Sequence, residues 1–217
     1  MAAQSANRKP QLGEPMTMLF KSAAIAFWLT IALSAAVMPS AALAEKFVVT
    51  PIAEKKIAEL PPGPLFWQIE MFPTLAQAQA AAGPTSLAAE VSGKVWLFTL
   101  GAKGAAGHGG THVTEIGPVP RITAPEYLLR INHAKGSPGA KTPVHSHPGS
   151  ETFYVLKGRL GQKTPHGVSY ADAGQSMTGH GPGMPMEVFS AGTVDLDQLV
   201  MFFVDATKPF SVPAKFP

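Results

Sequence analysis

The sequence predicts an all-β protein built from short strands, arranged as a sandwich or a barrel. Its 217 residues include 21 glycines and 21 prolines, which is typical of strands joined by tight turns and unusual for a helical protein. Roughly eight to ten segments rich in aromatic and β-branched residues lie between these turn residues, at the spacing of a small β-domain. We therefore expect many short strands and little helix.

The first 44 residues have the features of a secretory signal peptide. Residues 22–44 carry no charge, Lys21 precedes them, and Ala42-Leu43-Ala44 offers a small-residue cleavage site before Glu45. We expect cleavage after Ala44 and a periplasmic or secreted protein. The alternative is an uncleaved membrane anchor, for which the apolar run is short. Met16 or Met18 can be the true start, which would make the first fifteen residues an annotation artefact.

The composition excludes several classes of protein. Without the three basic residues and one acidic residue of the leader, the formal charge of +3 falls to +1, and no basic run with interleaved aromatics suggests a nucleic-acid partner. Cysteine is absent, so an exported chain must rely on its hydrophobic core rather than on disulfides. We expect no membrane partner after cleavage of the signal segment.

Residues 45–120 are expected to form an N-terminal extension that contributes strands. Residues 45–60 suggest a short strand followed by a helical turn, ended by prolines. The aromatic residues 65–72 and the segment 95–100 predict strands. Alanine-rich residues 75–82 predict a short helix that closes at Gly-Pro. Further β-structure is expected at 112–116, and we expect residues 65–120 to add strands to the edges of the main domain or to help a second subunit pack.

Residues 121–217 are expected to form the main domain. Its strands are predicted from apolar alternation between turn residues, over residues 127–132, 152–157, 168–170, 186–189 and 199–204.

The segment that carries chemistry runs from Gly139 to Gly158 and contains His145, His147 and Glu151 at HxHxxxE spacing. Alternate residues of a strand point to the same face, so both imidazoles can reach one point. Glu151 can join them from the next strand if residues 148–150 make the turn. Two imidazoles and one carboxylate suit a borderline transition-metal ion.

This segment resembles the first conserved motif of the cupin superfamily, in which a glycine precedes His-x-His, a glutamate follows, and a second glycine closes the motif. Gly139, His145, His147, Glu151 and Gly158 fall on that pattern. The resemblance covers roughly residues 126–205. It implies a cupin β-barrel (a double-stranded β-helix, or RmlC-like jelly roll) with an N-terminal strand and short-helix extension. It also implies an exported cupin with one such domain, and we expect a homodimer.

The second cupin motif is incomplete. Its candidate begins at Gly174 and includes a Pro-Gly turn, but Met186 stands where the resemblance implies a third histidine. Three outcomes are open for the fourth ligand position: the soft thioether of Met186, which suits copper best, a water on an open two-His-one-carboxylate site, or His180 folding back from the same turn. We therefore predict a divalent transition metal (Fe, Mn, Ni, Zn or Cu) bound by His145, His147, Glu151 and His180.

Other side chains around the motif follow from strand parity. Phe153 should share the face of Glu151 and give the metal an apolar surrounding, whereas Tyr154 should point away. Such a lining favours a small organic substrate. We expect His108 and His112 to be solvated loop residues. The sequence identifies no catalytic base beyond the ligands themselves and no organic cofactor.

Three functions are consistent with these residues. The first is a metal-dependent enzyme of the bacterial cell envelope, an oxygenase or isomerase that acts on a small organic molecule. The second is a non-catalytic cupin that binds a small ligand and has lost a complete metal site. The third is a structural or storage protein.

Overall fold

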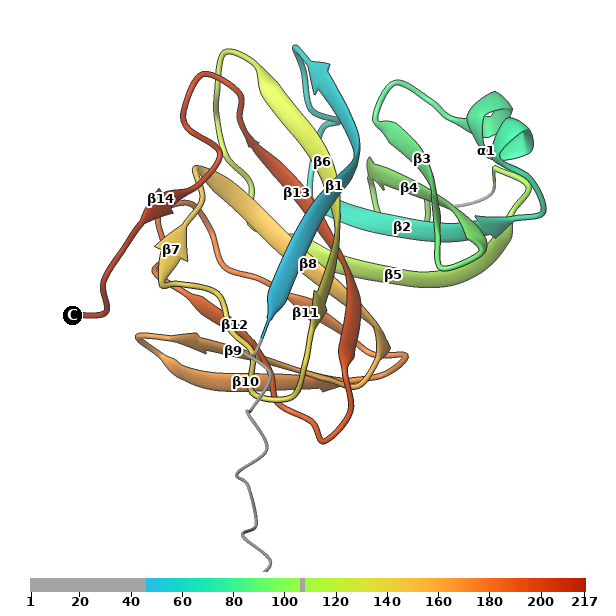
Figure 1. Ribbon diagram of the computed structural model, residues 1–217. Helices are drawn as coiled ribbons and strands as arrows, with labels where there is room; N and C mark the ends of the chain where they lie inside the picture. The colour runs from blue at the N-terminus through green and yellow to red at the C-terminus, as the bar shows by residue number, and fades with distance from the viewer. Residues whose placement is uncertain (1–45, 106–107) are drawn as a thin grey trace, which may run out of the picture. The chain divides into compact units, whose positions relative to one another are not determined.

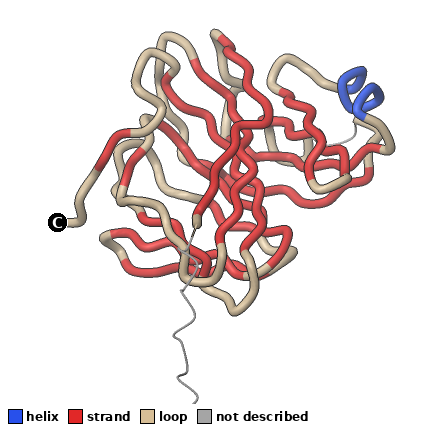
Figure 2. The backbone as a smooth tube through the Cα atoms, in the orientation of Figure 1, coloured by secondary structure: helices blue, strands red, loops and turns tan. Residues whose placement is uncertain are grey.

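The computed structural model describes residues 46–105 and 108–217 (Figure 1). The predicted signal segment and the alternative start sites lie outside these residues. Figure 2 shows that the described regular structure is almost entirely strand, with a single short helix. No helix within the described ranges is long and apolar enough to cross a membrane. The predicted all-β fold class is confirmed.

Fourteen strands and one helix make up the described chain. The elements before the candidate metal motif are β1 (Phe47–Ile57), β2 (Leu65–Phe72), α1 (Leu75–Ala81), β3 (Ser86–Val91), β4 (Lys94–Gly101), β5 (Thr111–Val119) and β6 (Tyr127–Gly136). The elements from the motif onward are β7 (His145–Ser146), β8 (Gly149–Lys157), β9 (Arg159–Thr164), β10 (Gly167–Asp172), β11 (Ser176–Thr178), β12 (Glu187–Ser190), β13 (Leu196–Asp205) and β14 (Val212–Pro213).

A five-stranded antiparallel sheet forms the centre of the fold. Its order is β1-β6-β13-β8-β11, so β13 lies between β6 and β8 and pairs with both along most of its length. Successive side chains of β13 alternate between the two faces of this sheet. Val200 and Phe202 belong to one apolar cluster, and Leu199, Met201 and Phe203 belong to another.

One face of the central sheet closes into a barrel. A three-stranded sheet, ordered β10-β9-β12, and the short pair β14-β7 complete the structure on this side. Leu160 of β9, Ala171 of β10 and Val188 of β12 pack in one buried cluster with Phe153 of β8 and Val200 of β13. This two-layer arrangement of short antiparallel strands is the predicted cupin β-barrel.

The other face of the central sheet is covered by a second sheet, ordered β3-β4-β2-β5. Trp67 of β2 and Phe98 of β4 are fully buried against Leu129 of β6 and Phe203 of β13. Strands β2 to β5 thus form a separate layer and are not edge strands of the central sheet, whereas the alternative that residues 65–120 help a second subunit pack stays a prediction. The domain boundary between residues 120 and 121 stays a prediction.

Most predicted elements are present, but the structure also contains differences from the expected elements. The expected helix at 75–82 is α1, begun by Thr74, whose side chain accepts a hydrogen bond from the Gln77 backbone N–H. The predicted short strand and helical turn at 45–60 is wrong, because β1 continues to Ile57 as an edge strand paired with β6. Strand β3 was not predicted, since residues 86–91 are mostly small and polar.

The connection after β11 packs tightly against β8, and this contact can be tested with two glycines. A Cβ added at Gly179 would lie 2.1 Å from the backbone oxygen of Glu151, to which the Gly179 N–H donates a hydrogen bond. We expect Gly179→Ala to lower the free energy of unfolding by roughly 1–3 kcal/mol in urea denaturation, because backbone atoms must move.

The matched control is Gly181→Ala, two residues further along the same connection. Its Cβ would meet Pro120 at 3.5 Å, an ordinary van der Waals contact. We expect it to change the free energy of unfolding by less than about 1 kcal/mol. Equal stability of the two variants would contradict the tight packing at Gly179.

Candidate metal centre

The structure brings His145, His147 and Glu151 together. His145 lies on β7, His147 follows it by two residues, and the chain bends at Pro148 before Glu151 enters β8. One ligand atom from each of the three residues lies within 4.8 Å of the other two. The two imidazole rings are nearly perpendicular, with centroids 5.0 Å apart. This spacing can hold one metal ion.

Backbone carbonyls orient both imidazoles. Nδ1 of His145 lies 2.8 Å from the carbonyl oxygen of Pro143, and Nδ1 of His147 lies 2.7 Å from that of Phe210. A carbonyl only accepts hydrogen bonds, so each Nδ1 carries the proton and donates it. Each Nε2 then keeps its lone pair, as a metal ligand requires.

Burial keeps Glu151 and His147 uncharged near pH 7 when no metal is bound. Glu151 is 3 % exposed, and its Oε2 makes no hydrogen bond to the described protein. Burial raises the pKa of Glu151 to about 8. Burial also lowers the pKa of His147 to about 4, helped by the nearby charges of His145 and Arg130 and opposed by the hydrogen bond to Phe210. A buried carboxyl group without a protein partner fits a metal ligand.

Met186 lies beside this group. It is bridged to His145 by two backbone hydrogen bonds of 2.9 and 2.8 Å, so the two side chains share one face of the strand pair. The thioether is buried, and its sulfur accepts a hydrogen bond from Gln162 Nε2 at 3.4 Å. The position predicted for a third imidazole therefore holds a sulfur that already has a polar partner.

His180 does not join the group. Its ring lies 6.3 Å from that of His166, and the cluster of possible ligands among the described residues contains only the other three. Burial, followed by the charge of His166, lowers the pKa of His180. The structure thus unites three of the four residues predicted to bind metal, and the role of His180 as a ligand stays a prediction.

The three groups open into a cavity of about 390 Å³. Most of its wall is apolar, and Phe153 lies in it on the same side as Glu151, as strand parity predicted. Tyr154 points to the other face of the sheet, where it packs edge-on against Trp96. Such a lining excludes water from a bound organic molecule.

Three residues of the cavity wall were missed by the sequence reasoning. Asn132 on β6 and Gln198 on β13 are buried amides on the cavity face, and Phe210 comes from the segment before β14. Phe210 also packs on His147, with ring centroids 4.8 Å apart. The alternation of apolar residues predicted the strands β6 and β13. Which residues of these strands face the cavity depends on how the strands pair with each other.

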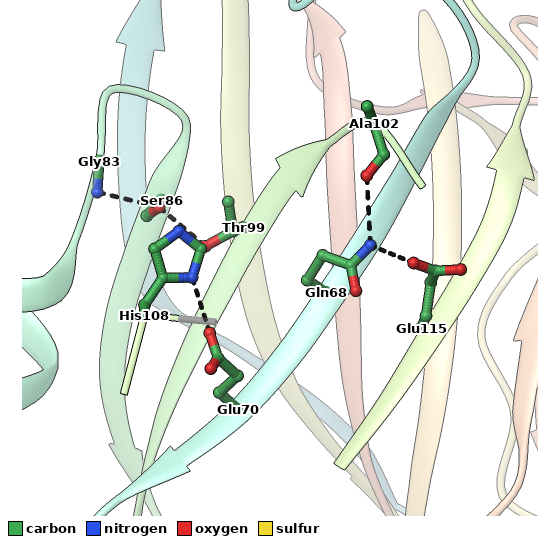
Figure 3. A network of polar contacts seen from close by, with 8 residues as sticks. All are labelled: Gln68, Glu70, Gly83, Ser86, Thr99, Ala102, His108 and Glu115. Carbon is green, nitrogen blue, oxygen red and sulfur yellow. Dashed lines mark hydrogen bonds and ion pairs between the residues drawn. The ribbon is translucent and has the colours of Figure 1, made fainter. Parts of the chain in front are cut away.

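A second polar cluster lies in the other layer (Figure 3). His108 Nδ1 is 2.7 Å from the carboxylate of Glu70, and Gln68 donates a hydrogen bond to Glu115, whose pKa this bond lowers. The Gly104 backbone N–H also donates to Glu115. His108 is therefore a half-buried hydrogen-bond partner of Glu70, and the expectation that this loop residue is solvated is wrong. These contacts hold the segment after β4 onto β2.

The shifted pKa values of Glu151 and His147 predict a dependence of stability on pH in metal-free protein. Between pH 4.5 and 8 the folded chain holds the Glu151 proton that the unfolded chain releases, so stability falls as pH rises. His147 acts oppositely between pH 4 and 6.5, because the unfolded chain binds the extra proton there. Only the Glu151 effect remains above pH 6.5.

We expect the free energy of unfolding of chelator-treated protein to fall by up to about 2 kcal/mol between pH 6.5 and 8, at about 1.4 kcal/mol per pKa unit. Glu151→Gln cannot ionise, so its stability should change less over this range. Urea denaturation at several pH values measures both proteins. Parallel curves for the two would show that Glu151 does not titrate with a raised pKa.

No protein-family model and no curated protein matches the sequence. Among solved structures, a cupin-like protein from Thermotoga maritima is 17 % identical, with a TM-score of 0.37, over 41 % of this chain and 65 % of its own. The polyketide cyclase RemF from Streptomyces resistomycificus is 20 % identical, with a TM-score of 0.35, over 41 % and 62 %.

A third similar structure is the DMSP lyase DddQ from Ruegeria pomeroyi, 20 % identical, with a TM-score of 0.35, over 40 % of this chain and 43 % of its own. The aligned part thus spans less than two thirds of each of these proteins. The fold assignment comes from this chain itself, from its antiparallel strand order and from the motif residues Gly139 to Gly158. On these two grounds, the chain is a protein of the cupin fold.

Proposed function

We propose that this chain is a metal-binding cupin that acts on a small organic molecule in its barrel cavity. The observation that carries the proposal is the convergence of the His145, His147 and Glu151 ligand atoms within 4.8 Å of one another. Both Nε2 atoms are left free by the carbonyl contacts of the Nδ1 atoms. Two imidazoles and one carboxylate bind Fe, Mn, Ni, Zn or Cu.

The residues of the site would act in three ways. Pro143 and Phe210 hold the two imidazoles in the ligating tautomer through their carbonyl oxygens. Glu151 gives up its proton when the metal binds and then supplies the negative charge. The apolar wall keeps water from the bound molecule. A metal in this site would polarise a carbonyl group or activate oxygen, which suits an isomerase or an oxygenase.

The cellular setting is part of the proposal and rests on the sequence. The uncharged leader and its small-residue cleavage site support export to the bacterial envelope, in the periplasm or outside the cell. A homodimer is also proposed, because β1 is an edge strand of the central sheet among the described residues. A small organic ligand is supported by the size and the apolar wall of the cavity.

A second function is favoured by Met186. Its sulfur takes the place of an imidazole and already accepts a hydrogen bond from Gln162. A thioether is a weaker ligand than an imidazole, so a site with this sulfur in the fourth position binds metal less tightly than a site with a third histidine. The chain would then be a non-catalytic cupin that holds a small ligand in the same cavity.

Metal analysis separates these functions. We expect protein purified without a histidine tag to hold close to one equivalent of a transition metal after reconstitution. His147→Ala and Glu151→Gln should lower metal affinity at least tenfold, because each removes a direct ligand. His112→Ala is the matched control, since this exposed histidine lies on β5 in the other layer; it should leave metal content unchanged.

Less than a tenth of an equivalent of metal in the reconstituted wild-type protein would reject the proposed metal centre. If thermal-shift experiments then still found ligand binding that chelator does not alter, the non-catalytic function would be supported.

A further inference from the structure

Two buried amides line the barrel cavity apart from the metal group. Asn132 is 4 % exposed and Gln198 is 1 % exposed. Oδ1 of Asn132 and both amide atoms of Gln198 make no hydrogen bond to the described protein. Most buried side-chain polar atoms in proteins have a partner. These amides are therefore able to bond to a molecule in the cavity.

Strand register places the amides relative to the metal group. Glu151 of β8 pairs with Phe202 of β13, so their side chains lie next to each other on the cavity face. Side chains paired across neighbouring strands in this way form one row of the sheet. Asn132 pairs with Val200, two residues from Phe202, and so belongs to the next row. Gln198 belongs to the row after that. Rows on one face of a sheet are about 7 Å apart. The amides thus lie further along the cavity floor than Glu151.

We propose that Asn132 and Gln198 form a second polar subsite, which binds one end of a ligand whose other end reaches the metal centre. This inference rests on the proposed metal-binding function and adds to it a class of ligand. The two amides are diagonal neighbours on adjacent strands, close enough for one ligand group to contact both. Phe153 and Val200 lie on the cavity face in the row between Glu151 and Gln198, and they contact the apolar middle of the ligand.

The charges of the wall determine the kind of group that fits. Among the described residues that line the cavity there is no lysine or arginine. An amide both donates and accepts hydrogen bonds, and it carries no charge. The subsite therefore binds a neutral group, such as a hydroxyl, a carbonyl or a carboxamide, and disfavours a second carboxylate, which would be buried without a cation.

The predicted ligand is a small molecule with a metal-binding oxygen group at one end, a ring or short apolar chain in the middle, and a neutral hydrogen-bonding group at the other end. Para-substituted benzoates provide probes of this shape. The carboxylate of 4-hydroxybenzoate can bind the metal, and its hydroxyl lies on the opposite side of the ring. Benzoate lacks the hydroxyl, and terephthalate replaces it with a second carboxylate.

The experiment is calorimetric titration of zinc-loaded protein with the three benzoates. We expect the wild-type protein to bind 4-hydroxybenzoate about fivefold to tenfold more tightly than benzoate, the value of one net hydrogen bond. Terephthalate should bind no better than benzoate. In the double variant Asn132→Leu, Gln198→Met, which keeps similar side-chain volumes, the preference for the hydroxyl should disappear while benzoate affinity stays within about threefold.

Thermal denaturation of the ligand-free double variant provides a second measurement. Because the amides lack protein partners, their removal should leave the melting temperature unchanged or raise it. A clear fall would show that the amides stabilise the fold instead, and would overturn the subsite.

Zinc content separates this inference from the proposed function. If every form holds zinc, then equal affinities for benzoate and 4-hydroxybenzoate, no binding of either probe, or a preference that survives in the double variant would overturn the subsite alone. Absence of zinc from wild-type protein would overturn both the metal centre and the subsite that depends on it.

Discussion

The register of β13 between β6 and β8 is the constraint on which the rest of the structure depends. Side chains alternate along a strand, so the cavity receives Gln198, Val200 and Phe202, while Leu199 and Met201 pack against the second sheet. A slip of one residue would exchange these two sets. Such a slip would turn the Gln198 amide toward the apolar second sheet. It would also remove Phe202 from its position beside Glu151. Both cores and the metal site therefore require one register.

Within that register, no cationic side chain of the described residues pairs with the carboxyl group of Glu151. Arg130 lies in the same row of β6, but its guanidinium pairs with Glu54 and lies over the ring of Phe210, 4.1 Å from its centre. Burial is the cause that raises the pKa of Glu151, and no neighbouring cation offsets it. A bound metal ion would supply the missing positive charge. Because Arg130 pairs with Glu54, the carboxyl group of Glu151 stays free for the proposed metal.

The sequence predicted those features that depend on neighbours along the chain. The same-side placement of His145 and His147 and the turning away of Tyr154 follow from strand alternation. Features set by pairing between distant segments were not predictable in this way. The charged residues 54–56 of β1 look like a helical turn until their pairing with β6 is known, because tertiary context overrides weak propensity. Asn132 and Gln198 are neighbours only through the pairing of β6 with β13.

The polar cluster on β2 and the polar groups of the barrel cavity differ in what satisfies them. On β2, the carboxylate of Glu70 has the His108 ring and that of Glu115 has the Gln68 amide and a backbone N–H. In the barrel, Oε2 of Glu151 and both amide atoms of Gln198 have no hydrogen-bond partner among the described residues. A buried polar group is stabilising when it is paired and costly when it is not. The first cluster therefore holds a loop to a sheet, whereas the second keeps buried polar groups to which a metal and a ligand inside the barrel would bond.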